Sequence, residues 1–155
     1  MFSIPFYTAL IVGFPEVCLM LLMGFYLSNI RKLNISKIAF IACIQATITY
    51  EVRKFSLVFG IHTIIHIITL SLLVYFILNI NFYKAVISVL IGTVLQGIIQ
   101  SIMLPSILSL YGINPLNLVQ NPKYVTLCFI PIFIVSCLLI LIMKKFNISI
   151  WDIEK

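Results

Sequence analysis

Five long apolar runs, separated by short polar stretches, constrain this chain more than any other feature of its sequence. A helix that crosses the hydrocarbon core of a bilayer needs about 20 apolar residues. Runs of this length and spacing therefore predict an all-α, polytopic integral membrane bundle, forming a single transmembrane helical domain over residues 1–155. The expected spans are residues 4–28, 37–52, 55–78, 82–110 and 124–143.

The composition excludes a soluble globule. Of the 155 residues, 63% are hydrophobic and 9% are charged, whereas soluble chains are roughly 45–50% apolar and about 25% charged. Five spans leave no room for a separate catalytic or nucleic-acid-binding domain. The net charge of +6 comes from basic residues placed singly or in pairs at the ends of the runs. These positions indicate anchors to lipid headgroups, so we expect a lipid bilayer as partner and no nucleic acid.

The second run is the weakest of the five. Its apolar part, Ile38 to Tyr50, is short and contains Gln45, Thr47 and Thr49. A run of this length can also be an interfacial or re-entrant segment. Extended from Ile35 to about Val52, it can cross if neighbouring helices shelter it.

The distribution of Lys and Arg favours five crossings and gives the orientation. Five spans place seven basic residues on one side and three on the other. Cytoplasmic loops carry the excess of Lys and Arg, so we predict an outside N-terminus and an inside C-terminus in the cell (plasma) membrane. The asymmetry disappears if the second run does not cross. The seven are Arg31, Lys32, Lys37, Lys84, Lys144, Lys145 and Lys155; the three are Arg53, Lys54 and Lys123.

Glu16 is the clearest candidate for a functional residue. It lies about halfway along the first run, directly after Pro15. Ionisable groups inside a span are expensive and usually serve a function. The proline leaves an upstream carbonyl without its donor and can open a place for the carboxyl. Two interpretations stay open: a ligand or proton site, and a structural carboxyl bonded to a neighbouring helix.

Further polar side chains occur inside three other runs. His62 and His66 are four residues apart and share one helix face, as do Gln96 and Gln100, and Gln45 lies in the second run. Two histidines are too few for a closed zinc site, so we expect no metal and no cofactor. Polar groups of this kind often act as packing glue between helices. The alternative is that they line one central cavity together with Glu16.

A charged group stands at the outer end of the second run. Glu51, Arg53 and Lys54 can form a solvated ion-pair cluster, or can capture a charged ligand. The ligand-binding or polar-core residues predicted from the sequence are thus Glu16, Gln45, Arg53, His62, His66, Gln96 and Gln100.

Catalysis has little support in the sequence. No nucleophile elbow, zinc-protease motif or pair of aspartates is present, so we predict no catalytic residues. The four cysteines, Cys18, Cys43, Cys128 and Cys137, all lie in apolar stretches without ligand spacing. The enzymatic alternative is a membrane enzyme that acts through Cys43 and His62, as a cysteine protease would, or through Glu16.

Three short segments together carry a resemblance to a known family. Gly13-Phe14-Pro15-Glu16, Tyr50-Glu51-Val52-Arg53 and Phe59-Gly60-Ile61-His62-Thr63-Ile64 resemble the multi-span membrane input region of some Firmicutes sensor histidine kinases, in a stand-alone form. The sequence holds no dimerisation helix, phospho-acceptor histidine or ATP-binding domain of those bacterial kinases. The resemblance implies that whatever the input region recognises is inherited by Glu16, Arg53, Gly60 and His62.

Two functional classes follow from these observations. The first is a non-enzymatic sensing or regulatory protein that binds a small ligand, a peptide or a membrane partner. Such a protein would couple binding to a cytoplasmic signalling partner, acting through a partner protein or as a homo-oligomer, with Pro15, Pro105 and Pro131 as hinge candidates. The second is a substrate-binding subunit, or another component, of a membrane transporter.

Overall fold

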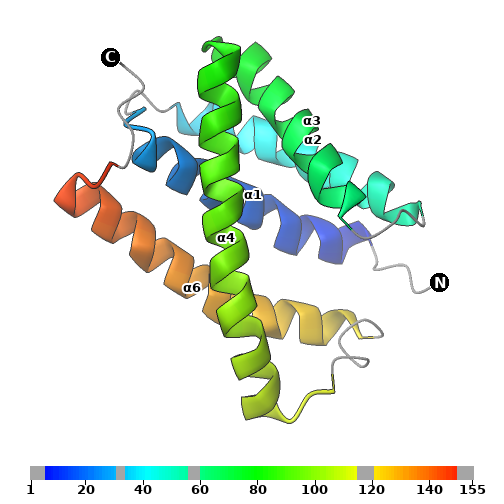
Figure 1. The fold of residues 1–155 in the computed structure, drawn as a ribbon. Helices are drawn as coiled ribbons and strands as arrows, with labels where there is room; N and C mark the ends of the chain where they lie inside the picture. Colours follow the sequence, from blue (N-terminus) through cyan, green and yellow to red (C-terminus); the bar gives the residue numbers. More distant parts are fainter. Residues whose placement is uncertain (1–5, 31–33, 56–59, 115–120, 150–155) are drawn as a thin grey trace.

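The fold of this chain is all-α, as predicted. The computed structural model describes residues 6–30, 34–55, 60–114 and 121–149, and within these ranges it contains five helices and no strand (Figure 1). All five helices are long and apolar enough to cross a membrane. They are α1 (Phe6–Leu27), α2 (Ile35–Lys54), α3 (Ile61–Leu78), α4 (Phe82–Tyr111) and α6 (Pro122–Phe146).

The second run forms a full-length helix. α2 has 20 residues, which corresponds to about 30 Å at 1.5 Å per residue and matches the hydrocarbon core. Asn34 caps its first turn, because the Asn34 side-chain oxygen accepts a hydrogen bond from the Lys37 backbone N–H at 3.4 Å. The polar residues that weakened the sequence pattern therefore lie within a helix long enough to span.

The predicted start of the third span at residue 55 is wrong. Phe55 is the C-cap of α2, with φ −79° and ψ 132°, and α3 begins only at Ile61. Gly60 precedes it with φ 93°, a left-handed conformation that glycine adopts without steric strain. Residues 56–59, between Phe55 and Gly60, lie outside the described ranges.

Helix ends coincide with Asn and Gly in left-handed conformations. Asn79 ends α3 with φ 56°, Gly112 ends α4 with φ 60° and Asn147 ends α6 with φ 51°. At each of these helix ends, the backbone N–H of the capping residue donates a hydrogen bond to a carbonyl oxygen of the last turn. Glycine and asparagine are the residues that close helices in this way, so the polar breaks in the sequence set the helix ends.

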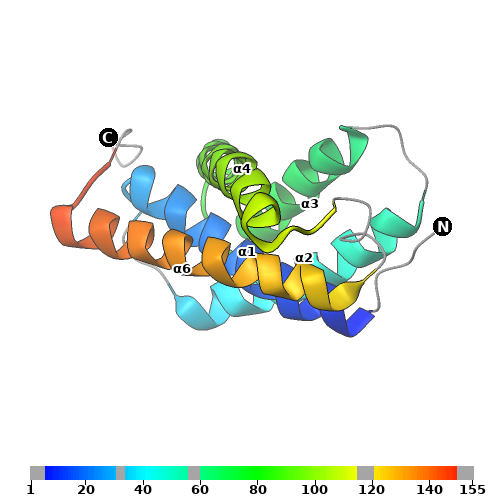
Figure 2. The ribbon, with the colours of Figure 1, turned by 90° about the horizontal axis from the view of Figure 1, so that it is seen from below.

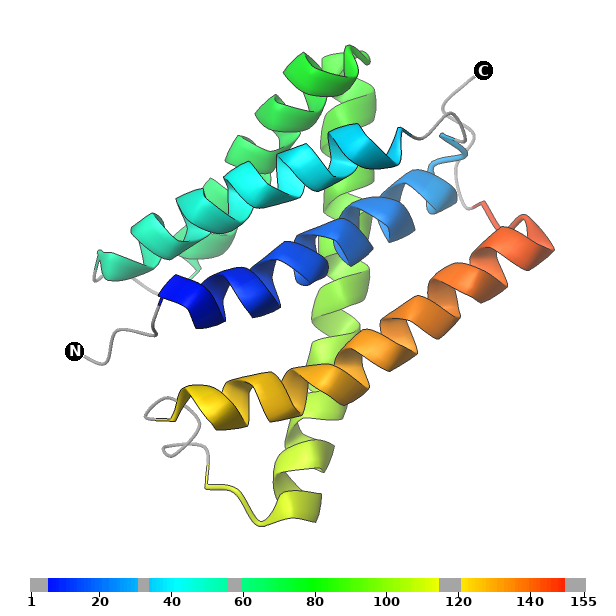
Figure 3. The same cartoon turned by 180° about the vertical axis from the view of Figure 1, so that it is seen from behind.

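The helices are arranged in two layers. α2, α1 and α6 lie side by side with α1 in the middle, and α4 crosses this layer obliquely (Figure 3). Viewed from below, α3 and α4 lie on one face of the three-helix layer (Figure 2). α4 has 30 residues, about 45 Å of helix, so its oblique path lets it fit within a bilayer core of about 30 Å. α1 contacts α2, α4 and α6.

The contact between α1 and α4 is made by backbones. A Cβ atom added to Gly24 would collide with the carbonyl oxygen of Ser88, and one added to Gly92 would collide with that of Met20. Both glycines are buried. Small residues allow helices in membranes to approach closely, and this reciprocal pair sets the crossing point of α4 over α1.

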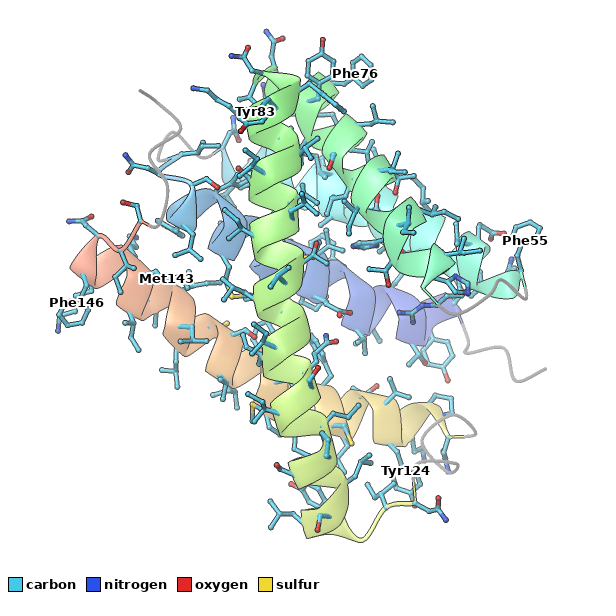
Figure 4. The ribbon with its side chains drawn as sticks, in the orientation of Figure 1. Phe55, Phe76, Tyr83, Tyr124, Met143 and Phe146 are labelled. Atoms are coloured by element: carbon cyan, nitrogen blue, oxygen red, sulfur yellow. The ribbon has the colours of Figure 1, made fainter. Side chains whose placement is uncertain are left out.

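The outer surface of the molecule is apolar, as a lipid-facing surface must be. Large hydrophobic side chains such as Val94, Ile98 and Ile102 on α4 are exposed. Several exposed aromatic residues lie at or near helix ends (Figure 4), where membrane proteins place their interfacial belts. They include Phe55, Phe76, Tyr83, Tyr124 and Phe146.

Candidate functional site

A cavity of about 300 Å³ lies between the helices, and all five helices contribute to its wall. It occupies the half of the molecule that contains the N-terminal ends of α1 and α3 and the C-terminal end of α2. Arg53, an exposed residue of the last turn of α2, lines it, so the cavity reaches the surface at that end. The seven residues predicted from the sequence all line this cavity: Glu16, Gln45, Arg53, His62, His66, Gln96 and Gln100.

One polar wall joins α2 to α3. The buried Gln45 side-chain nitrogen donates to Thr69 Oγ1 at 2.9 Å and approaches His66 Nδ1 at 3.1 Å and the His66 carbonyl oxygen at 3.4 Å. A backbone carbonyl can only accept, which places the amide nitrogen of Gln45, rather than its oxygen, at this position. With the amide nitrogen at this position, His66 Nδ1 is the acceptor of its contact with Gln45.

Thr49 and Thr69 complete this wall. Thr49 Oγ1 lies 3.1 Å from His66 Nδ1, and Thr69 donates to the Ile65 carbonyl oxygen at 2.8 Å. The chain from the Gln45 amide through the Thr69 hydroxyl to Ile65 thus has one consistent donor direction. Polar side chains inside a membrane protein need such partners, and these bonds hold α2 and α3 together beside the cavity.

A second polar wall joins α1, α4 and α6. Gln100 of α4 donates through its side-chain nitrogen to the carboxyl oxygen Oε1 of Glu16 on α1. One turn earlier, the buried Gln96 side-chain oxygen accepts from Ser136 Oγ of α6 at 3.3 Å. The proline before Glu16 does not interrupt α1, which runs as one helix. Glu16 therefore has a structural partner and at the same time lines the cavity, so both interpretations of this residue remain compatible with its position.

The outer charged group divides into two parts. Glu51 pairs with Lys54 at 2.8 Å, with both side chains about half exposed, so this pair is the solvated cluster expected for an interface. Within the described part of the chain, Arg53 has neither a hydrogen bond nor an ion pair.

Several buried polar atoms in the cavity wall lack hydrogen-bond partners among the described residues. They belong to Thr8, Gln45, His62 and Gln96: one hydroxyl oxygen, the Gln45 oxygen Oε1, the His62 ring nitrogen Nδ1 and the Gln96 nitrogen Nε2. Buried polar groups are rarely left unpaired in native proteins. Four such atoms belong to residues that line this one cavity.

Sequence reasoning missed the hydroxyl groups of the site. Thr8, Thr49, Thr69 and Thr93 line the cavity. The one available signal was helical spacing, since Thr49 follows Gln45 by four residues and Thr69 follows His66 by three. The cysteine of the enzymatic alternative is placed differently: Cys43 is exposed and does not line the cavity, whereas His62 does.

A metal centre finds no support in the described ranges. They contain no group of three or more His, Cys, Asp or Glu residues that could hold a metal ion. His66 Nδ1 already lies at hydrogen-bond distance, 3.1 Å, from both the Gln45 amide nitrogen and the Thr49 hydroxyl. His66 is therefore part of a hydrogen-bond network in the cavity wall, whereas His62 Nδ1 has no partner among the described residues.

Comparisons of the chain with protein-family models, curated proteins and solved structures found no match. The class of protein follows from the fold and the site: this is a multi-pass α-helical membrane protein whose helices surround a cavity with polar side chains in its wall.

Proposed function

We propose that this chain is a sensing or regulatory membrane protein that binds a small ligand in the cavity and couples binding to a cytoplasmic signalling partner. The observation that carries the proposal is the convergence of polar side chains from separate helices on one cavity, with buried polar atoms left unpaired around it. Polar groups inside a membrane are energetically costly. Helix packing alone would require only polar groups that are hydrogen-bonded to one another. The resemblance to input regions of Firmicutes sensor histidine kinases points the same way.

The dimensions of the cavity favour a small ligand over a partner's transmembrane helix. Its volume is about 300 Å³, at the lower end of the range of roughly 300–1,000 Å³ for small-molecule pockets. A helix with its side chains is about 10–12 Å across and would not fit.

α4 is the element best placed for coupling. Its Gln96 and Gln100 lie in the cavity, and the same helix continues past the Gly92 crossing to Phe82 at the opposite end of the bundle. A ligand shifts a conformational equilibrium only when it binds the two packings unequally. Contacts with Gln96 and Gln100 provide this difference if α4 changes its tilt about the crossing.

Filling the cavity tests this function. Gly97 lines the cavity, and an added Cβ atom there has no neighbour within 4 Å. We expect Gly97→Phe to reproduce, in transcript profiles of the source cell, the pattern caused by deleting the gene. The matched control is Ile98→Phe, which faces outward and should behave as the unchanged protein.

Both variants must reach the membrane in equal amounts for the comparison to hold. Gly97→Phe with an unchanged transcript profile would contradict the proposal. Unchanged transcripts together with reduced uptake of a solute would instead favour the substrate-binding subunit of a transporter.

A further inference from the structure

Two groups of opposite charge in the cavity wall lack a charged partner in contact. Glu16 has the Gln100 amide as its hydrogen-bond partner. Among the described residues no cation lies within ion-pair distance of its carboxyl, and Arg53 is likewise without an anion. Glu51, the nearest carboxylate along the chain from Arg53, is paired with Lys54 instead.

The two groups stand at different depths of the cavity. A Cβ atom on Gly13 would lie 3.7 Å from Ala46 Cβ, so these two residues mark one level of the α1–α2 contact. Glu16 is three residues deeper along α1, and Arg53 is seven residues farther out along α2. Their backbones are therefore separated by about 15 Å along the helices at 1.5 Å per residue. Both long side chains line the cavity between these two levels.

The wall between these groups offers neutral polar atoms and apolar surface. The His62 nitrogen Nδ1 and the Gln45 oxygen Oε1 are unpaired, and Val12, Val17 and Ile65 line the same space. Such a wall suits a short molecule with an apolar or amide-containing middle and a charge at each end.

We propose that the cavity binds a small zwitterion, with its ammonium group at Glu16, its carboxylate at Arg53 and its middle along the wall between them. This inference rests on the proposed function and names the class of ligand. A molecule with one charge would leave the other protein charge uncompensated, and unpaired charges in a low-dielectric environment are strongly unfavourable. A zwitterion compensates both and adds no net charge to the membrane interior.

The test uses the full chain, purified in lipid nanodiscs, and isothermal titration with zwitterions of increasing charge separation: γ-aminobutyrate, 6-aminohexanoate and dialanine. We expect at least one of them to bind. For dialanine, N-acetylation or C-terminal amidation should each weaken binding by about tenfold or more, because each removes one charge-assisted hydrogen bond.

Variants assign each end of the ligand to its residue. In the Glu16→Gln variant, dialanine and its N-acetyl form should bind with equal affinity. The C-terminal amide should still bind more weakly than dialanine. In the Arg53→Gln variant, dialanine and its C-terminal amide should bind with equal affinity, and the N-acetyl form should still bind more weakly. Such paired losses are what a double-mutant cycle measures for two groups in contact. Lys54→Gln is the matched control, because Lys54 is exposed and paired with Glu51, and it should bind as the unchanged chain does.

Two outcomes overturn the inference: none of the three zwitterions binds, or the blocked forms bind as well as the free ones. Either result would leave the proposed function standing if Gly97→Phe still reproduces the gene deletion. A Gly97→Phe variant that behaves as the unchanged protein would instead remove the proposed function itself.

Discussion

Gln45 connects two helices through a single amide. Its side chain is fully buried, with 0% exposure, and its nitrogen reaches both Thr69 and His66 across the α2–α3 contact. In lipid the unfolded alternatives also find partners, so one such bond contributes about 0.5–2 kcal/mol. Gln45 therefore contributes to the position of α3 beside the cavity as well as to the polar lining.

A double-mutant cycle measures this contribution. We expect Gln45→Ala and Thr69→Val to show a coupling of about 0.5–1.5 kcal/mol in the free energy of unfolding, measured by titrating the protein in mixed micelles with a denaturing detergent. Thr47→Val provides the control. The Thr47 hydroxyl donates to the carbonyl of Cys43 in its own helix. The effects of Thr47→Val and Gln45→Ala on the free energy of unfolding should therefore be additive. Purely additive effects of Gln45 and Thr69 would contradict the predicted bond.

The polar residues of the site could be predicted one at a time from the sequence, because Glu, His and Gln are rare inside spans. The threonines of the site could not be predicted in this way. A Ser or Thr hydroxyl in a helix can bond the carbonyl four residues earlier, as Thr93 does with Val89 at 2.7 Å. Such a residue is tolerated on any face of a spanning helix, so its presence gives no information about the direction in which it points.

At the scale of the helices, the crossing of α4 over α1 determines where the cavity can form. Gly24 and Gly92 bring the two backbones into contact, and the hydroxyl oxygen of Thr93, next to Gly92, lies 3.3 Å from the Met20 sulfur. From this point the helices diverge toward Glu16 and Gln100, where the cavity lies. The crossing thus fixes the end of the cavity at which α1 and α4 are in contact.

Alanine at either crossing glycine should force the helices apart. We expect Gly24→Ala and Gly92→Ala each to lower the free energy of unfolding by about 1–3 kcal/mol, the usual effect of overpacking. Gly97→Ala is the matched control on α4: its Cβ atom meets open space, and the substitution should leave stability unchanged or raise it slightly. Equal effects at the three glycines would show that the crossing is not held by backbone contact.

The elements themselves were largely predictable, whereas their contacts were not. Five apolar runs gave five helices, but α3 begins at Ile61 rather than at residue 55, because Phe55 caps the end of α2. The Gly24–Gly92 contact depends on how each helix is rotated about its axis. An apolar run in a membrane has no polar face that would fix this rotation, so hydropathy alone does not reveal it.

For the whole molecule, the positions of the basic residues give an orientation that can be tested. The five helices alternate in direction, so Lys37, Lys84 and Lys145 fall at one end and Lys54 and Lys123 at the other. The excess of positive charge predicts that the first end is cytoplasmic, and the cavity would then open outward.

Substituted-cysteine labelling in intact cells maps this orientation. With the native cysteines replaced, we expect an impermeant thiol reagent to label Lys54→Cys and Lys123→Cys from outside. Lys37→Cys, Lys84→Cys and Lys145→Cys should react only after the membrane is permeabilised. Labelling of Lys84→Cys from outside would reverse the position of the turn between α3 and α4 and contradict the five-span arrangement.

The most direct test of the central claim, a water-accessible cavity inside the bundle, compares two neighbouring residues of α4. Gly97 lines the cavity, whereas Ile98 faces outward and is 51% exposed on the apolar surface. Thiols react as thiolates, which form in water and not in hydrocarbon. In a chain without its native cysteines, Gly97→Cys should therefore react with an impermeant thiol reagent applied from outside, and Ile98→Cys should not. Equal reaction at both positions, or none at either, would contradict the cavity.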